Sequence, residues 1–191
     1  MRQILVILIT LPFITFGQIA FETIGNNVEL RVNANGTLGI DLETLSSRSN
    51  IPGSDFNYLK QAGIWIVAED YDGNYYTSVQ HVKGKDSFDF WPGPADTLTG
   101  QTDPPDKWNK VWKITRADVE DHKSNYLSTG YTPSKKLLEW PAQGKNGFNE
   151  VLAPYIDVNN NKVYDPQNGD YPYLRGDEMV YCIFNDLPEE H

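Results

Sequence analysis

Oxygen-bearing side chains recur at alternate positions in one segment near the C-terminal end of the sequence. Asp157, Asn159 and Asn161 stand at positions 1, 3 and 5 of this segment, and Asp165 stands at position 9. The main-chain carbonyl of Val163 is available at position 7. Calcium takes roughly six to eight oxygen ligands, and this spacing lets a tightly turning backbone direct successive oxygens to one point. The sequence therefore predicts a Ca²⁺-binding loop over residues 157–170.

Two positions depart from the usual calcium-loop pattern. Lys162 stands where such loops prefer glycine for a sharp turn, and Asn168 stands at the twelfth position, which is usually a bidentate acid. The final carboxylate could come instead from Asp170 or from Asp177. Of these two, Asp170 is the one that we include in the predicted ligand set.

Prolines close to both ends of the segment affect the kind of calcium site that is expected. Pro154 and Pro166 exclude long flanking helices, so a structural calcium clip in a loop is favoured over a calcium-sensing helix pair. The alternative is an Asn-rich turn whose side chains bond their own backbone and bind no metal.

The other chemistry-bearing residues show no catalytic signature. His81, His122 and His191 lack metal-ligand spacing, and there is no nucleophile elbow, phosphate-binding glycine loop or paired-histidine zinc helix. His122 follows Asp121 on a predicted helix, so we expect a solvated surface histidine. Cys182 is the single cysteine, which excludes an internal disulfide, and its apolar surroundings predict a buried, unreactive thiol.

Acidic pairs leave a secreted hydrolase open as a third functional possibility. Glu69 with Asp70, or Asp86 with Asp89, could act as the two carboxylates of a glycosidase. Because the chain holds 26 acidic residues, such pairs also arise by chance. The sequence favours a protein that is not an enzyme.

Tryptophans next to proline-rich stretches allow two interpretations. Their flat faces could stack on sugar rings, as in a carbohydrate-binding module, or they could fasten irregular coil onto a sheet. The coil is expected over residues 88–94 and 102–108, where prolines interrupt regular pairing. We favour the anchoring role for the four tryptophans concerned, Trp91, Trp108, Trp112 and Trp140.

Alternation of apolar and polar residues predicts two β-hairpins. The first pairs residues 27–32 with 37–40 across Asn33–Gly36, and the second joins residues 58–68 to 75–82 across Asp72–Asn74. Asn-Gly and Asp-Gly sequences tolerate the positive φ of a tight hairpin turn.

One central helix is predicted over residues Trp112–Tyr126. Thr115 and Asp118 have the spacing of a capping pair, and the residues that follow include neither glycine nor proline. A further turn or two of helix is expected over residues 134–140.

The N-terminal segment indicates the compartment. Residues 1–17 combine a cation at Arg2 with a short apolar run and a small residue at Gly17, which is typical of a secretory signal peptide. The apolar run is too short to span a bilayer, and no later stretch approaches that length. The net charge of −10 argues against a nucleic-acid partner. We therefore expect a secreted or cell-surface protein with a glycan or a surface protein as its partner.

Several recurrent strings resemble a known group of proteins. They are Ala62–Ile66 (AGIWI), the FDFWPGP segment, the stretch WKITRADVEDHKSNY, and above all DVNNNKVYDPQNGDYPYLRGD from Asp157 to Asp177. These strings resemble the N-terminal region of large secreted surface proteins of Bacteroidota, many of which carry a type IX secretion sorting domain. The resemblance implies an exported protein with calcium-binding loops. In such proteins more chain follows the GDYP-type segment, so we expect this sequence to be incomplete at its C-terminus.

Together these observations predict a mainly β fold, a β-rich α+β domain over residues 18–191. It would hold antiparallel hairpins, one short central helix and long loops pinned by aromatic side chains. The expected function is a non-enzymatic structural or adhesion module with a Ca²⁺-stabilised loop.

Overall fold

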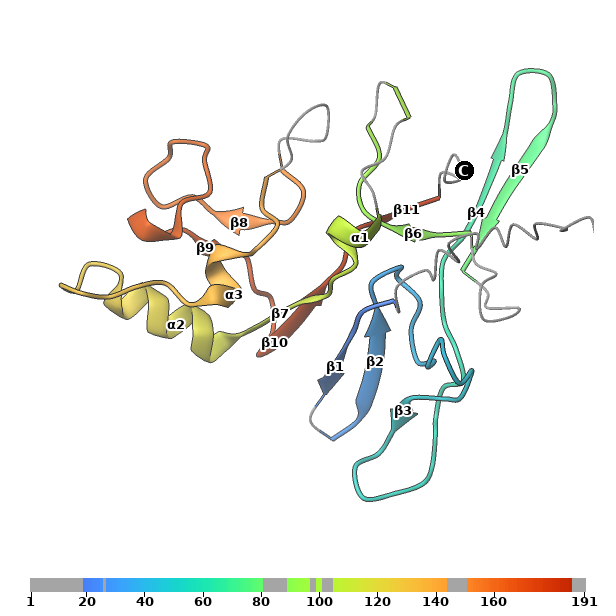
Figure 1. The fold of residues 1–191 in the computed structure, drawn as a ribbon, viewed down its shortest axis with the longest axis horizontal. Helices are drawn as coiled ribbons and strands as arrows, with labels where there is room; N and C mark the ends of the chain where they lie inside the picture. Colours follow the sequence, from blue (N-terminus) through green and yellow to red (C-terminus); the bar gives the residue numbers. More distant parts are fainter. Residues whose placement is uncertain are drawn as a thin grey trace, which may run out of the picture.

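A computed structural model describes residues 19–25, 27–80, 89–96, 99–100, 105–143 and 151–186 of the chain (Figure 1). The predicted signal peptide over residues 1–17 lies outside these ranges, as do His81, Asp86 and His191. Among the described residues, no helix combines the length and the apolar character needed to cross a membrane.

Short antiparallel strands dominate the regular structure, which confirms the predicted mainly β class. The described strands form one three-stranded sheet, in the order β1-β2-β3, and four two-stranded pairs. The strands are β1 Phe21–Gly25, β2 Glu29–Asn33, β3 Ser49–Asn50, β4 Trp65–Glu69, β5 Tyr75–Val79, β6 Trp91–Pro92, β7 Trp112–Thr115, β8 Tyr155–Ile156, β9 Tyr171–Pro172, β10 Glu178–Tyr181 and β11 Phe184–Asn185. The helices are α1 Pro105–Trp108, α2 Arg116–Asn125, α3 Lys135–Leu138 and a 3-10 helix at Pro166–Asn168.

The antiparallel ribbon of β7 and β10 lies at the centre of the molecule (Figure 1). Ile114 pairs with Met179 and belongs to the core cluster that α2 and α3 cover. Val180, one residue along, belongs to a second cluster with Val32 of β2. Successive residues of a strand point to opposite faces, so this one ribbon contributes to two apolar clusters.

The predicted helix over Trp112–Tyr126 is therefore correct only in its second part. Its first four residues form β7, because Trp112 and Ile114 alternate with the less buried Lys113 and Thr115. This is the period of a strand with one buried face. The partner strand β10 begins at Glu178, opposite Thr115 and far along the chain.

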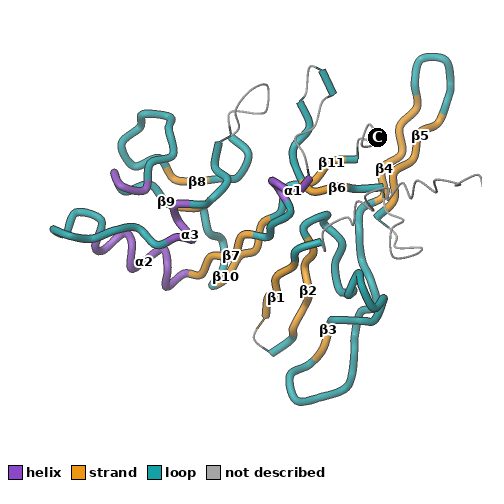
Figure 2. Tube along the Cα trace, in the orientation of Figure 1, coloured by secondary structure: helices purple, strands orange, loops and turns teal. Residues whose placement is uncertain are grey.

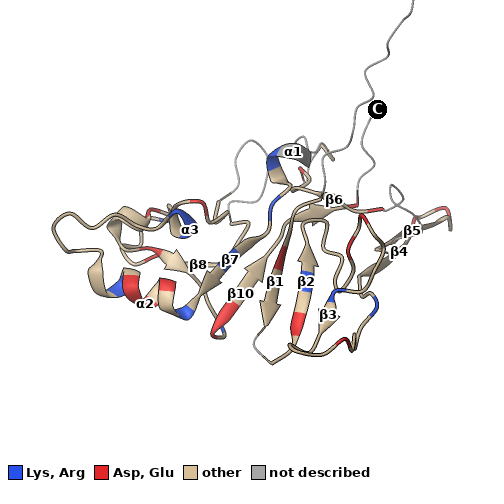
Figure 3. Cartoon of the chain, turned by 60° about the horizontal axis from the view of Figure 1, so that its bottom comes forward, with Lys and Arg blue, Asp and Glu red and all other residues tan. Residues whose placement is uncertain are grey.

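The predicted start signal of α2 is confirmed at Thr115. The Asp118 amide donates to Thr115 Oγ1 at 3.2 Å, and the Thr115 amide donates to the Asp118 carboxylate at 2.9 Å. These reciprocal bonds form a capping box, which satisfies amides that the first turn of a helix leaves free. The outer positions of α2 are charged (Figure 3), and Lys123 pairs there with Glu120.

The first predicted hairpin forms its turn and a short antiparallel pairing around Val32 and Leu38, but no regular second strand. The Gly36 amide donates to the Asn33 carbonyl at 2.9 Å, and Val32 forms a single antiparallel bridge with Leu38. The regular partner of β2 is β1, whose Phe21 lies opposite Asn33. No pattern in the sequence predicted β1.

The second predicted hairpin is confirmed as β4 and β5, with Trp65 opposite Val79 and Glu69 opposite Tyr75. It extends away from the rest of the molecule (Figures 1 and 3). Residues on both of its faces are exposed, with Trp65 at 72% on one face and Tyr76 at 60% on the other. This hairpin is therefore the main exposed apolar element of the described structure.

Two of the four anchoring tryptophans are buried, and the other two are half-buried. Trp112 and Trp140 lie in the core cluster, and Trp108 packs edge-on against Trp112 with ring centroids 6.3 Å apart. The anchoring interpretation accounts for these three. The adjoining coil is more regular than predicted, because β6 pairs with β11 and residues Pro105–Trp108 form α1.

A buried ion pair beside β2 leads to a pH prediction. Arg31 Nη1 lies 2.8 Å from Asp41 Oδ2, and the amides of Glu43 and Thr44 donate to Asp41 Oδ1. Burial raises the pKa of Asp41, but the amide bonds and the Arg31 charge outweigh it and lower the pKa to about 2. Because the folded-state pKa is depressed, this stabilisation is complete above the unfolded value and is lost as pH falls to about 2.

We expect Asp41 to contribute about 2 kcal/mol to the free energy of unfolding at neutral pH. This contribution should be lost as the pH falls from about 4 to about 2. In urea unfolding across this range, Asp41→Asn should lack this component of the pH dependence. Asp55→Asn, an exposed control, should follow the wild type. A wild-type-like pH slope in Asp41→Asn would contradict the assignment.

Candidate metal centre

The predicted calcium loop connects β8 to β9 and forms a rounded turn at one end of the molecule (Figure 2). Ile156 pairs with Tyr171. This antiparallel pairing places Asp157, just after β8, close to Asp170, just before β9. Two carboxylates that are separated along the chain thus stand at the two ends of one closed loop.

The first half of the loop turns around its own side-chain oxygens. The amides of Asn161 and Lys162 donate to Asp157, at 3.2 Å to Oδ1 and 2.8 Å to Oδ2. The Asn161 amide also lies 3.0 Å from Asn159 Oδ1, and the Val163 amide donates to Asn161 Oδ1 at 2.8 Å. The side chains at positions 1, 3 and 5 therefore all bond the backbone of the turn, which both a calcium loop and an Asn-rich turn without metal would show.

Lys162 adopts the conformation that glycine usually supplies at the sixth position. Its φ is +63°, and Asn160 has a φ of +59°. Left-handed backbone costs roughly 1–2 kcal/mol for a residue with a side chain. The Gln143 side chain holds this turn by donating to the Lys162 carbonyl at 2.7 Å and accepting from the Tyr164 amide. The sharp turn thus forms without glycine.

Asp165 collects hydrogen bonds from several side-chain amides. Asn168, Asn161 and Asn159 donate to its carboxylate at 2.9, 3.0 and 3.2 Å. These bonds, led by the one from Asn168, lower the pKa of Asp165. The amide hydrogens surround the Asp165 carboxylate with partial positive charge. A bound cation would neutralise the same carboxylate.

Asp170 is fully buried, which is unusual for a carboxylate. It accepts the Val158 amide on Oδ1 at 2.8 Å and the Asp165 amide on Oδ2 at 3.0 Å. Burial raises the pKa of Asp170; the two amide bonds oppose this, and the nearby Asp165 carboxylate adds to it. Two adjacent carboxylates repel each other, and a divalent cation between them would relieve that repulsion.

The loop suits a hard cation better than a soft one. Its side-chain donors are carboxylate and amide oxygens, which Ca²⁺ prefers over the nitrogen and sulfur ligands of zinc. Within the described residues, no group of three or more His, Cys, Asp and Glu is arranged as metal ligands. A calcium ion here would therefore depend on Asn159, Asn161 and the Val163 carbonyl in addition to the acids.

The structure separates the two alternatives for the last carboxylate. Asp170 closes the loop, whereas Asp177 is exposed and pairs with Arg116 at 2.9 Å. Two side chains that were not among the predicted ligands also bond loop atoms, Asn168 from within the loop and Gln143 from outside it. Asn168 stands where the pattern expects an acid, and no spacing signal marks Gln143.

His122 is fully buried, so the predicted surface histidine is wrong. It shares the inner face of α2 with Val119, and its Nδ1 lies 3.1 Å from the Tyr131 hydroxyl. Burial lowers the pKa of His122, which favours the neutral ring. Cys182 is half-buried, and burial raises its pKa to about 11, so the thiol is protonated at neutral pH.

Asp70, one of the candidate hydrolase acids, serves the hairpin turn. It accepts bonds from the amides of Asp72 and Asn74 at 2.9 Å each, and from the Tyr76 hydroxyl at 3.1 Å. Hydrogen bonds, first that of the Asn74 side chain, lower the pKa of Asp70. A general acid needs the opposite shift.

Comparisons with protein-family models, with curated proteins and with solved structures find no match to this chain.

Proposed function

We propose that the chain is a non-enzymatic structural or adhesion module of a secreted or surface-exposed protein, and that Ca²⁺ closes its 157–170 loop. The observation that carries the proposal is the convergence of Asp165 and buried Asp170 within a turn already formed around Asp157. Tyr164 and Pro166 pack inward, but residues 158–163 are exposed, so a cation would supply the cohesion that packing does not give this half of the loop.

Sequence features support the exported setting. The leader-like residues 1–17 and the resemblance to surface proteins of Bacteroidota both favour a compartment outside the cytoplasm. Extracellular calcium suits weak sites with dissociation constants of about 0.1–1 mM.

Calcium should raise the melting temperature of the purified chain. For a dissociation constant near 1 mM, about 10 mM Ca²⁺ adds roughly 1.4 kcal/mol of stability. For a chain of this size, that corresponds to about 3–6 °C in a thermal melt. Asp165→Asn should abolish the rise, because it removes the charge at the centre of the amide cluster.

Asp55→Asn is the matched control for this melt, since it removes one exposed acid at a distance from the loop. It should retain the full calcium response. No rise in the wild type, or an equal rise in both variants, would overturn the calcium proposal.

Carbohydrate binding is the second candidate function, and one observation favours it. The most exposed tryptophan among the described residues is Trp65 on β4. It is not one of the four tryptophans that the sequence marks for sugar stacking or coil anchoring. It borders an open pocket at the base of the hairpin.

A further inference from the structure

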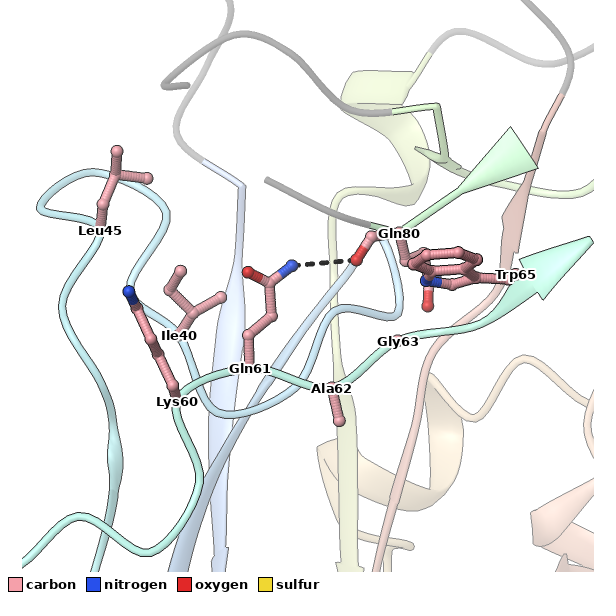
Figure 4. A pocket seen from close by; sticks show the side chains of 8 residues that line it. All are labelled: Ile40, Leu45, Lys60, Gln61, Ala62, Gly63, Trp65 and Gln80. Carbon is pink, nitrogen blue, oxygen red and sulfur yellow. Dashed lines mark hydrogen bonds between the residues drawn. The ribbon is translucent and has the colours of Figure 1, made fainter. Parts of the chain in front are cut away.

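A pocket of about 650 Å³ opens where the β4–β5 hairpin joins the rest of the molecule (Figure 4). Ile40 and Leu45 form an apolar wall, and the segment from Lys60 to Gly63 leads past it to Trp65. The pocket therefore combines apolar surface, an aromatic ring and polar side chains from separate parts of the chain.

Gln80 fixes the geometry of this pocket. Its side chain is buried, donating to the Asn35 carbonyl and accepting from the Ile64 amide, both at 2.7 Å. Gly63 permits this close packing, because a Cβ there would lie 2.5 Å from the Gln80 Cβ. The backbone that carries Gln61 and Trp65 is thus held against a buried residue.

Three polar groups at the pocket are available to a ligand. Gln61 donates through Nε2 to the Gln80 carbonyl at 2.9 Å, which leaves its Oε1 as an acceptor (Figure 4). Within the described part of the chain, Lys60 forms no ion pair and the Trp65 indole nitrogen has no hydrogen-bond partner. The pocket thus offers a cation at one end, at Lys60, an acceptor between the ends, at Gln61, and an exposed aromatic ring at the other end, at Trp65 (Figure 4).

We propose that this pocket binds a segment of an acidic glycan, in which one pyranose ring stacks on Trp65 and a uronic acid residue further along the glycan lies at Lys60. The Trp65 face matches the apolar face of the sugar ring. Gln61 Oε1 accepts from a ring hydroxyl, and Lys60 pairs with the carboxylate. The inference rests on the carbohydrate-binding candidate and is independent of the calcium loop.

Other anionic ligands match fewer of these groups. An aromatic carboxylate has no hydroxyl for Gln61. A neutral sugar would leave Lys60 without a partner. In a chain with a net charge of −10, few cations on the described surface lack an acidic partner, so Lys60 is available to an anionic ligand.

The test compares three probes by calorimetry on the full chain: a tetramer of galacturonate, its methyl ester and a neutral glucose tetramer. Galacturonate should bind most tightly, and Lys60→Met and Trp65→Ala should each weaken it by about tenfold or more. Tyr71→Ala at the hairpin tip and Lys135→Met on α3 are the controls and should leave binding unchanged. Both test residues are exposed, so neither change should unfold the chain.

The outcomes separate the two levels of the inference. Equal binding of all three probes would overturn the uronate assignment while supporting carbohydrate binding. Galacturonate binding that survives both Lys60→Met and Trp65→Ala would overturn this pocket as the site. No binding of any probe at millimolar concentration would overturn both.

Discussion

Replacing Trp140 with alanine should lower the free energy of unfolding by about 3–5 kcal/mol, the largest effect that we expect from a single substitution. The side chain is only 4% exposed and lies in the core cluster with Ile114 and Leu137. Its ring centroid is 5.5 Å from that of Tyr181, and its Nε1 donates to the Pro154 carbonyl at 3.2 Å. The truncation would leave a cavity and would also remove one of the two hydrogen bonds that the Pro154 carbonyl accepts, the other coming from the Tyr173 amide at 3.0 Å.

Urea unfolding of Trp140→Ala measures this loss, and Trp65→Ala is its control. Because Trp65 is exposed, its truncation should change stability by no more than about 0.5 kcal/mol. Similar losses in both variants would show that the core is not centred on Trp140.

Replacing Gly169 with alanine should have the second largest effect, about 2–5 kcal/mol, from two separate causes. Gly169 has a φ of +105°, where a side chain costs roughly 1–2 kcal/mol. An added Cβ would also lie 2.7 Å from the Tyr126 ring, and such overpacking typically costs about 1–3 kcal/mol. Since Gly169 directly precedes Asp170, the same change should weaken the calcium response.

Gly130→Ala separates the two causes. Gly130 has a φ of +82°, and a Cβ there would meet nothing within 4 Å. It should show the backbone cost alone and leave the calcium-dependent melt intact. Equal destabilisation by both substitutions would mean that Tyr126 moves aside at no cost.

Local signals in the sequence predicted local structure well. The Thr115–Asp118 pair marks the start of α2, and the Asp-Gly turn marks the β4–β5 hairpin, because each signal lies within a few residues of the structure it forms. The turn at residues 157–163 is local in the same way, since its side-chain oxygens accept amides of the loop itself, and whether the loop binds calcium stays a prediction.

Features that depend on distant partners were not predicted. Residues Trp112–Thr115 precede a helix and read as part of it, but they pair with β10, more than 60 positions later. His122 is adjacent to a charged residue and yet is buried, since it lies on the inner face of α2 and its ring packs against Tyr126 and Tyr131. The pairing of β1 with β2 likewise depends on a short segment with a weak pattern of its own.

The candidate calcium loop also combines features that depend on nearby residues with features that depend on distant ones. The choice of Asp157, Asn159 and Asn161 as candidate ligands depends only on their spacing. The choice between Asp170 and Asp177 depends on the pairing of β8 with β9, which closes the loop on Asp170. The hydrogen bond from Gln143 to the Lys162 carbonyl comes from a different segment of the chain, so the loop sequence carries no signal for it.

The extended hairpin of β4 and β5 also has a consequence for the dynamics of the chain. The two strands pack chiefly against each other, and a two-stranded hairpin is only marginally stable by itself. Its amide hydrogens should therefore exchange with solvent through local opening, while those of β7 and β10 should exchange only when the core unfolds. A ligand held at the hairpin base would slow exchange in β4 and β5 first, reporting occupancy in a part of the chain that contributes little to global stability.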